Sequence, residues 1–365
     1  MVFLGGPRQC GKTTLAQSVL EKFPYRGGGR GLYLNWDDDE HRRRIQHREW
    51  AAEDELVVFD ELHKFRRWKA WLKGLHDTTK HAHTYLVTGS ARLDVYRRGG
   101  DSLMGRYHYW RLHPFTLSEP VPGISPKEGF RRLMEVGGFP EPFLDGDARE
   151  AQRWRKERFE RVIRDDIRDL ERIQEIRTLE LFVDALREKV GGAIVLSNIA
   201  LDLQVAQKTL NRWLDALERM YLLFVVRPLT ARIPRAVQKP PKVYFFDNGD
   251  VRGDEGARFE NLVATHLLKR LHYLEDSTGI RHGLSYIRDK EGREVDFAVL
   301  RDGRVTDLIE AKWADSALHR PLQYYAERLR PRRAIQLVAN LKAPYDKGDL
   351  RIRGIDELAR PLAED

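Results

Sequence analysis

The stretch VFLGGPRQCGKTT, Val2 to Thr14, places a short apolar strand, a glycine-rich loop and the start of a helix in direct succession. Its loop fits the pattern G-x-x-x-x-G-K-T, which here is formed by Gly6, Gly11, Lys12 and Thr13. A loop without bulky side chains lets backbone N–H groups point at phosphate oxygens, and the helix behind it adds partial positive charge. The stretch therefore predicts a phosphate-binding loop at the end of a parallel strand.

This loop predicts ATP and Mg²⁺ as cofactors. Lys12 is expected to neutralise the β- and γ-phosphates, and the Thr13 hydroxyl is expected to ligate Mg²⁺. The residues expected to contact the nucleotide are those of the loop and of the helix start: Gly6, Pro7, Arg8, Gln9, Cys10, Gly11, Lys12, Thr13 and Thr14.

Length and composition limit how many domains the chain can form and which kinds of partner and site it can have. A chain of 365 residues, 41% of them apolar, is long enough for two or three domains. The formal charge of +8 favours a nucleic-acid partner without requiring one. A single cysteine excludes an intramolecular disulfide and a cysteine zinc cluster. Because there is no apolar run of membrane-spanning length and no signal peptide before the first strand, we expect a cytoplasmic protein without a membrane segment.

Two further strands are expected to bring polar side chains to the loop. The apolar run that ends in Asp60 and Glu61 is typical of a buried parallel strand, whose carboxyl end is where such sheets bind ligands. We expect Asp60 to hold Mg²⁺, largely through water, and Glu61 to polarise the attacking water; the alternative is a strand that ends at a surface turn. After the strand Thr84–Thr88, either Thr88 or Ser90 is expected to sense the γ-phosphate.

Arg106 lies between a predicted helix and a predicted strand, Tyr107 to Leu112. In a ring of subunits an arginine at this place can reach a neighbour's γ-phosphate and act as an arginine finger. It therefore predicts a homo-oligomer, with a hexamer as one form. The alternative is a solvated surface arginine.

Four segments together resemble the AAA+ superfamily of P-loop ATPases, and within it the prokaryotic proteins with a C-terminal DUF4143 domain. They are GPRQCGKTT, VVFDELHK, TGSARL and GRYHYWRLHPFT. The resemblance implies an α/β fold with a P-loop parallel sheet. It continues in GGFPEP, where related ATPases carry a Gly-x-Pro lid motif near the adenine; Gly138 and Pro140 occupy those positions here.

The middle of the chain is expected to be helical. Apolar spacing over 149–188 predicts amphipathic helices. From Leu196 to Val226 the order short helix, turn, helix (Ala206–Met220) and strand is that of a winged helix. The second helix would then enter the DNA major groove with Gln207, Lys208, Asn211 and Arg212 facing outward. The alternative is a lid or dimer module that never touches DNA.

The C-terminal part suggests a second centre. Residues 284–314 predict three strands with tight turns at Glu291-Gly292 and Asp302-Gly303. A three-residue loop would pair Arg301 with Val305, and the same register sets Asp296 opposite Glu310, with Lys312 on the same face. Two carboxylates and a lysine at one spot could carry out metal-assisted phosphodiester hydrolysis.

This arrangement resembles the PD-(D/E)xK nuclease superfamily, which includes archaeal Holliday-junction resolvases. The resemblance implies a restriction-endonuclease-like α/β fold, metal binding by Asp296 and Glu310, and a water-activating role for Lys312. It adds Glu260 as a further ligand and Gln323 as an accessory residue. The alternatives are a surface salt bridge on a hairpin and a nuclease relative that no longer cuts.

We therefore predict three domains: an AAA+ core over 1–120, a helical lid with winged-helix character over 121–240, and a nuclease-like domain over 241–365. The expected function is ATP-dependent processing of DNA, which can be branched, with cleavage at the C-terminal site. The alternative is an ATP-gated switch whose nuclease fold only grips nucleic acid or protein. A nucleotide kinase is weaker, because no site for a phosphoryl acceptor is evident.

Overall fold

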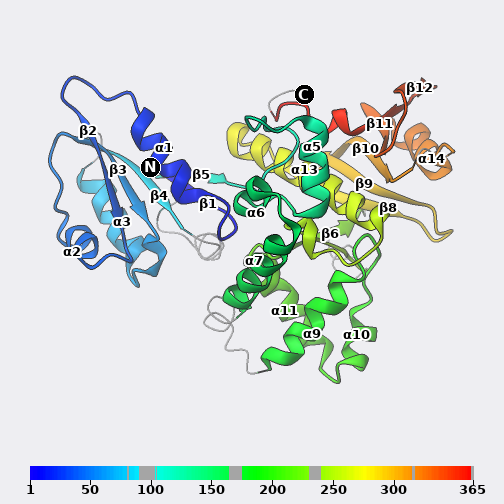
Figure 1. Cartoon of the computed structure of the whole chain (residues 1–365), viewed down its shortest axis with the longest axis horizontal. Helices are drawn as coiled ribbons and strands as arrows, with labels where there is room; N and C mark the ends of the chain where they lie inside the picture. Colours follow the sequence, from blue (N-terminus) through cyan, green and yellow to red (C-terminus); the bar gives the residue numbers. More distant parts are fainter. Residues whose placement is uncertain are drawn as a thin grey trace. The chain divides into compact units, whose positions relative to one another are not determined.

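The computed structural model describes residues 1–79, 82–89, 103, 105–163, 175–229, 240–314 and 317–362. Their contacts divide the chain into two compact units. The first comprises Met1–His113 with Arg219–Tyr221, and the second comprises Pro114–Glu218 with Leu222–Asp365. Each unit is built on a sheet of its own (Figure 1).

The first unit contains a five-stranded sheet in the order β2-β3-β4-β1-β5, and all its strand pairs are parallel. Its strands are β1 (Val2–Gly5), β2 (Arg30–Asn35), β3 (Asp54–Asp60), β4 (Thr84–Thr88) and β5 (His108–Arg111). Its helices are α1 (Lys12–Lys22), α2 (Asp39–His47), η1 (Leu62–Lys64) and α3 (Trp68–Thr78). The P-loop parallel sheet expected from the first strand and loop is confirmed.

Both faces of this sheet are covered, which explains why β3 is apolar at consecutive positions. Val57 and Phe59 belong to a core cluster with residues of α2 and α3. Leu56 and Val58 belong to a second cluster, in which Ala16 of α1 packs. Since successive side chains of a strand point to opposite faces, only a strand buried on both sides needs such a run.

The second unit combines helices with an eight-stranded mixed sheet in the order β12-β13-β11-β10-β9-β8-β6-β7. Its strands are β6 (Leu223–Pro228), β7 (Lys242–Phe245), β8 (His282–Arg288), β9 (Glu294–Arg301), β10 (Arg304–Lys312), β11 (Arg333–Val338), β12 (Tyr345–Lys347) and β13 (Leu350–Arg353). Its helices are α5 (Pro126–Glu135), α6 (Pro140–Asp145), α7 (Ala148–Arg161), α9 (Ile176–Arg187), α10 (Leu196–Asp202), α11 (Gln207–Arg219), η3 (Asn248–Asp250), α13 (Glu255–Thr278), α14 (Arg320–Leu329) and η4 (Ile355–Glu357).

The segment expected to form a winged helix has the expected order of elements, α10, a turn, α11 and β6. Its strand, however, pairs antiparallel with β7 and parallel with β8, so it belongs to the same sheet as the C-terminal strands. The domain boundary expected at residue 240 therefore lies between two neighbouring strands of one sheet, and the boundary expected at residue 120 lies a few residues after the first unit ends.

The hairpin of β9 and β10 corrects one expectation about register. Arg301 pairs with Arg304, not with Val305, because Asp302 and Gly303 alone form the turn, both with positive φ. An irregularity between Val305 and Asp307 then adds one residue to β10, and Ile309 pairs with Phe297. This bulge restores the expected offset, so Glu310 still comes opposite Asp296.

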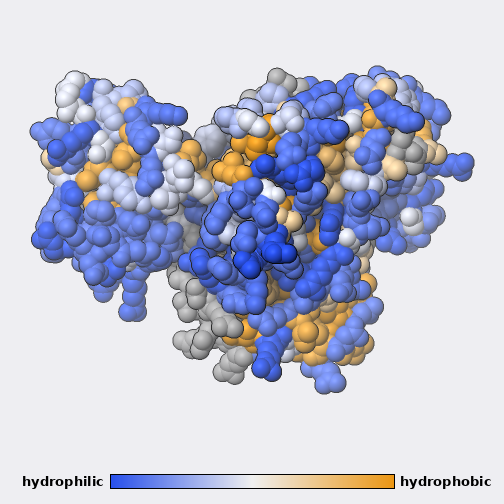
Figure 2. Space-filling view, in the orientation of Figure 1, coloured by the Kyte–Doolittle hydropathy of each residue, from blue (hydrophilic) through white to orange (hydrophobic). Residues whose placement is uncertain are grey.

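The surface of the second unit has an apolar area over α9 and α10 (Figure 2). Leu181, Val195 and Leu201 are exposed there, and Leu201 is 78% accessible. Among the helices that the structure describes, none has the length and apolar content needed to cross a membrane.

Candidate functional site

The glycine loop between β1 and α1 is held in a backbone conformation that side chains disfavour. Gly11 caps α1 with φ 91°, and Gly6 has φ 142°. A Cβ atom at Gly6 would lie 2.2 Å from the backbone oxygen of Leu112. The ammonium group of Lys12 is buried and donates to the carbonyl oxygens of Gly6 at 3.2 Å and Pro7 at 2.5 Å. The lysine thus lies within the loop that the motif assigns to phosphate.

Asp60, at the end of β3, accepts hydrogen bonds from hydroxyl groups on three different elements. Its Oδ2 accepts from Thr13 at 2.8 Å and from Tyr33 at 2.6 Å, and its Oδ1 accepts from Thr88. Burial, and then the hydrogen bond to Asp60, raise the pKa of Tyr33. The structure brings together three of the expected site residues, Thr13, Asp60 and Thr88, whereas Ser90 lies outside the described residues.

The hydroxyl oxygen of Thr13, at the start of α1, lies next to a carboxylate oxygen of Asp60, at the end of β3. Hard cations such as Mg²⁺ prefer oxygen ligands of this kind. These residues therefore fit the metal that the loop motif predicts. Sequence reasoning missed Tyr33. The contact follows from the parallel pairing of β2 with β3, which sets Asn35 beside Asp60 and places Tyr33 two residues before that pair. The sequence carries no local signal for this register.

Glu61 follows Asp60 in the left-handed backbone region, with φ 55°. Its Oε2 lies 3.3 Å from the ammonium nitrogen of Lys64 and 3.6 Å from Nε2 of His63. Its backbone N–H donates to Oδ1 of Asp60 at 3.0 Å. The water-polarising role assigned to Glu61 stays a prediction, and Lys64 and His63 are neighbours that the sequence did not indicate.

Arg106 is paired inside its own unit. Its Nε donates to Oδ1 of Asp77 at 2.9 Å, and its Nη2 donates to Oδ2 at 3.4 Å. Asp77 lies near the end of α3 and is partly exposed. The arginine-finger role stays a prediction, and Asp77 is the group that would have to release this guanidinium.

Gly138 and Pro140, expected near the adenine, belong to the second unit, where Pro140 begins α6. The carbonyl oxygen of Gly138 accepts from the backbone N–H of Phe115 at 2.7 Å. A Cβ atom at Gly138 would lie 2.5 Å from the carbonyl oxygen of Phe115, so close backbone packing explains this glycine. Their contact with nucleotide stays a prediction.

Helix α11 has one buried and one exposed face. Leu210, Trp213, Leu214 and Leu217 are buried in the core of the unit. The residues expected to face DNA are all exposed: Gln207, Lys208, Asn211 and Arg212. Apolar side chains on the neighbouring helices α9 and α10 are exposed as well. DNA binding by α11 and the alternative, a lid or dimer module that never touches DNA, both stay predictions.

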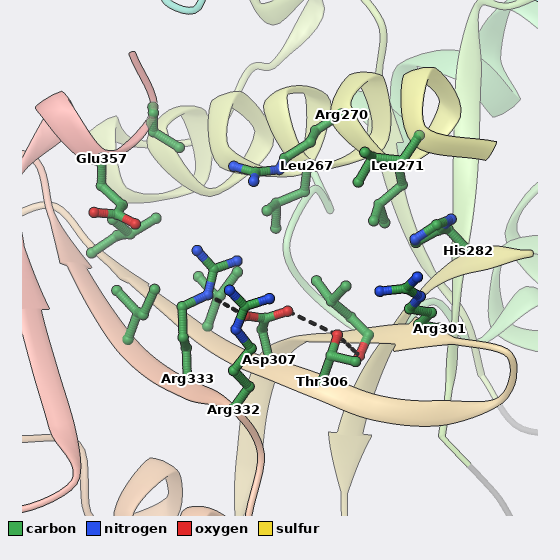
Figure 3. Close-up of a pocket in the computed structure, with 16 residues that line it drawn as sticks. Leu267, Arg270, Leu271, His282, Arg301, Thr306, Asp307, Arg332, Arg333 and Glu357 are labelled. Carbon is green, nitrogen blue, oxygen red and sulfur yellow. Dashed lines mark hydrogen bonds and ion pairs between the residues drawn. The ribbon is translucent and has the colours of Figure 1, made fainter. Parts of the chain in front are cut away.

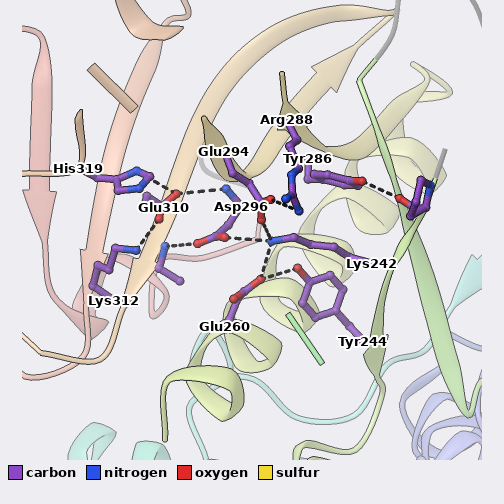
Figure 4. A network of polar contacts seen from close by, with 12 residues as sticks. Lys242, Tyr244, Glu260, Tyr286, Arg288, Glu294, Asp296, Glu310, Lys312 and His319 are labelled. Carbon is purple, nitrogen blue, oxygen red and sulfur yellow. Dashed lines mark hydrogen bonds and ion pairs between the residues drawn. The ribbon is translucent and has the colours of Figure 1, made fainter. Parts of the chain in front are cut away.

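A cluster of acidic side chains surrounds Lys242 of β7 (Figure 4). The Lys242 ammonium lies 2.7 Å from Oε1 of Glu294, 3.1 Å from Oε1 of Glu260 and 3.1 Å from Oδ1 of Asp296. Burial alone would lower the pKa of Lys242, but the three carboxylates raise it above its ordinary value. Sequence reasoning missed both Lys242 and Glu294, because neither lies within a motif.

The predicted carboxylate–lysine set adjoins this lysine. Oε2 of Glu310 accepts from the backbone N–H of Asp296 at 3.2 Å, and Oε1 lies 2.6 Å from the ammonium of Lys312. His319 Nδ1 lies 3.3 Å from Oε2 of Glu310. Burial, and then the charge of Asp296, raise the pKa of Glu310; burial, and then Lys312, lower the pKa of His319 to about 4.

The structure thus brings Glu260, Asp296, Glu310 and Lys312 together, but it does not arrange them as ligands of one metal. Within the described part of the chain, no three histidine, cysteine, aspartate or glutamate side chains form a group that could hold a metal ion. The expected Mg²⁺ ligands face a lysine instead, so the donor set does not fit a divalent ion as it stands. The side chain of Gln323 is exposed and donates to Glu327 at 3.2 Å, and its backbone N–H donates to the carbonyl of His319 at 3.3 Å.

A separate pocket of about 190 Å³ lies between α13 and the sheet (Figure 3). Its lining includes four arginines, Arg270, Arg301, Arg332 and Arg333, and two carboxylates, Asp307 and Glu357, together with apolar side chains such as Leu267 of α13 and Ile309 of β10. The guanidinium of Arg333 pairs with the buried carboxylate of Asp307. Its excess of positive charge suits a phosphate group.

Three parts of the chain match known domain families. Residues 1–121 match a family described as AAA domain. Residues 127–252 match a domain of unknown function (DUF8612), and residues 255–352 match another (DUF4143). The division between the last two matches falls close to the start of α13.

Two curated relatives are the uncharacterized proteins Mb2031c of Mycobacterium bovis and Rv2008c of Mycobacterium tuberculosis. Each is 26% identical over 251 residues, which cover 68% of this chain and 54% of the relative. The chain therefore spans about half the length of the curated relatives it matches.

Two solved structures align at low scores. The Orc1 protein of Aeropyrum pernix, in complex with DNA, is 13% identical; the alignment covers 74% of this chain and 88% of that chain, with a TM-score of 0.34. A RuvB variant of Thermotoga maritima is 16% identical; the alignment covers 65% and 87%, with a TM-score of 0.30. Because these scores are low, the two structures carry no weight here. The domains of this chain are identified by the family matches and by the two sheets described above. The chain thus carries an AAA domain at its N-terminus and a DUF4143 domain at its C-terminus.

Proposed function

We propose that the protein binds and hydrolyses ATP and uses this cycle to act on DNA. The observation that carries the ATPase part is the convergence of Lys12, Thr13 and Asp60 at the head of α1, within the matched AAA domain. Lys12 would neutralise phosphate charge, while Thr13 and Asp60 would hold Mg²⁺, which supplies charge stabilisation when bound. Glu61 would orient and polarise the attacking water.

The ATPase proposal is tested by separating binding from hydrolysis. Lys12→Ala should abolish tight ATP binding in calorimetry, whereas Lys22→Ala, a matched exposed lysine on the same helix, should bind like the wild type. Glu61→Gln should retain ATP but hydrolyse it about 100-fold or more slowly, the usual loss when a general base is removed. Wild-type hydrolysis by Glu61→Gln would contradict the role of this residue.

Two basic surfaces support a DNA partner, together with the net charge of +8. One is the exposed polar face of α11, with Lys208 and Arg212. The other is the pocket of Figure 3, where Arg301 and Arg332 are exposed. Lysine and arginine contacts to phosphates make binding weaken as salt concentration rises, and each lost contact lowers that dependence.

Three double variants that each remove two positive charges distinguish these surfaces. They are Lys208→Ala with Arg212→Ala, Arg301→Ala with Arg332→Ala, and, as an exposed control elsewhere, Lys127→Ala with Arg149→Ala. The variant on the contacting surface should weaken DNA binding and reduce the slope of affinity against salt by about two relative to the control. Equal binding by all three would remove both surfaces from the proposal.

The second candidate function is the ATP-gated switch whose nuclease-like part grips but does not cut. The observation that favours it is the position of Lys242 among the expected metal ligands. Incubation with plasmid, linear or branched DNA and Mg²⁺ or Mn²⁺ should then give no cleavage. Metal-dependent cleavage that Lys312→Ala abolishes would favour the DNA-processing enzyme.

A further inference from the structure

We infer that Lys242 is a built-in cation that takes the place of a divalent metal ion in the carboxylate cluster of the DUF4143 domain. The cluster is then a permanent ionic clamp and not a metal-dependent centre. This inference concerns the second unit alone and does not depend on ATP binding.

The hydrogen-bonding capacity of Lys242 is fully used. An ammonium group has three N–H donors, and three carboxylate oxygens lie within 3.1 Å of its nitrogen. They come from two elements that are distant in sequence from β7: Glu260 from α13, and Glu294 and Asp296 from β9. Figure 4 shows the side chain reaching between them.

The remaining oxygens of Asp296, Glu294 and Glu310 also have partners. Oδ2 of Asp296 accepts from the backbone N–H of Ala311 at 3.1 Å. Glu310 uses one oxygen for the backbone N–H of Asp296 and the other for Lys312. A divalent ion would have to displace these partners, and it would also meet the repulsion of a buried ammonium a few ångströms away.

The charges are close to balanced without a metal. Four carboxylates, from Glu260, Glu294, Asp296 and Glu310, face three cations, Lys242, Lys312 and Arg288. With all four carboxylates ionised, the sum is minus one (four negative against three positive charges). Adding a divalent ion beside Lys242 would change the net charge of the cluster from minus one to plus one. A divalent ion that replaced the Lys242 ammonium would instead bring the net charge to zero.

Lys242 also has little freedom to leave. Its side chain is 1% exposed. On one side its nitrogen lies 5.5 Å from the ring centre of Tyr286, whose hydroxyl donates to the carbonyl of Pro240 at 2.6 Å. On the other side its strand pairs with β6, and the backbone N–H of Ile194 donates to the carbonyl of Pro241 at 2.7 Å. The clamp thus ties β7 to α13 and β9.

The test measures metal binding directly, with Mn²⁺ by electron paramagnetic resonance and with Tb³⁺ by luminescence. All proteins carry Asp60→Asn, which removes the expected ligand in the other unit. The parent protein should show no saturable site, and Lys242→Met should gain one site per chain. Adding Glu260→Gln to Lys242→Met should abolish the gained site, whereas adding Glu255→Gln, an exposed control on the same helix, should leave it.

Thermal unfolding gives a second readout, since Lys242→Met leaves carboxylates buried without a counter-charge and should unfold at a lower temperature. Mn²⁺ should raise the unfolding temperature of Lys242→Met but not that of the parent, because a ligand stabilises only the state that binds it. Mn²⁺ bound by the parent and lost with Asp296→Asn would overturn the inference. So would a folded Lys242→Met protein that binds no metal. If Lys242→Met does not fold, the comparison of the parent with Asp296→Asn still decides the question.

Discussion

At the scale of single residues, Asp60 joins residues of the glycine-loop motif to residues that lie outside it. The motif accounts for Thr13, and the strand ends account for Asp60 and Thr88. The structure adds Tyr33, whose hydroxyl shares Oδ2 of Asp60 with Thr13. Three hydroxyl groups and the backbone N–H of Glu61 donate to this carboxylate and hold it in a single orientation, which is the condition for a residue that must present an oxygen at a defined point.

His266 predicts a loss of stability in acid. It is buried on α13, its Nε2 accepts from the backbone N–H of Leu117 at 2.8 Å, and burial lowers its pKa from 6.5 to about 4. Above pH 6.5 the imidazole is neutral in both states. Between pH 6.5 and 4 only the unfolded chain takes up the proton, so the free energy of unfolding should fall with pH, by about 3 kcal/mol at pH 4.

Urea unfolding of the wild type and of His266→Gln at pH 7, 6 and 5 checks this prediction. The variant should be less stable at pH 7, but its stability should decline less steeply as the pH falls. The same pH slope in both proteins would show that another group is responsible.

At the scale of elements, a buried charge network joins α7, α9 and η3. Oδ1 of Asp250 lies 2.5 Å from Nη2 of Arg187, and Oδ2 lies 3.8 Å from Nη1 of Arg158. Arg155 of α7 pairs with Asp247 at 3.0 Å. These ion pairs connect the helical middle of the chain to the segment that follows β7.

Asp250→Ala should destabilise the second unit strongly. The substitution would remove a carboxylate that faces the buried guanidinium groups of Arg158 and Arg187. Removing one partner of a buried ion pair lowers the free energy of unfolding by about 3–5 kcal/mol. The control is Asp184→Ala, because Asp184 pairs with the same Arg187 at 2.9 Å but is 40% exposed, and such pairs contribute about 1 kcal/mol or less. Denaturant unfolding measures both, and equal losses would contradict the network's role.

At the scale of the whole molecule, the predicted property is assembly into an oligomer. Arg106 is the residue that would act between subunits, and here it pairs with Asp77 of its own chain. If it is an arginine finger, the guanidinium must exchange this carboxylate for a neighbour's phosphate. Its effect should therefore appear in hydrolysis and not in nucleotide binding.

Arg106→Ala should bind ATP like the wild type and hydrolyse it about 1,000-fold more slowly. Asp77→Ala, which removes the competing carboxylate, should hydrolyse ATP at least as fast as the wild type. Light scattering of the ATP-bound wild type should show an oligomer. A strictly monomeric protein with full activity, or an Arg106→Ala protein of wild-type activity, would leave this arginine without the proposed role.

Short-range patterns in the sequence predicted the local features. The loop from Gly6 to Thr13, the buried strand that ends at Asp60 and the hairpin strands follow from short-range rules on glycine, apolar runs and turn residues. The opposition of Asp296 and Glu310 was also anticipated, although through a turn one residue too long. The bulge after Val305 compensated for that error.

Contacts between groups that are distant in the sequence became evident only from the folded chain. Tyr33 reaches Asp60 through the pairing of β2 with β3, and Lys242 reaches Glu260, Glu294 and Asp296 through the packing of β7 against α13 and β9. A side chain's neighbours across a sheet depend on strand order and register, which no local pattern encodes. The character of the C-terminal cluster, whether a metal centre or a lysine clamp, is therefore a property of the folded unit.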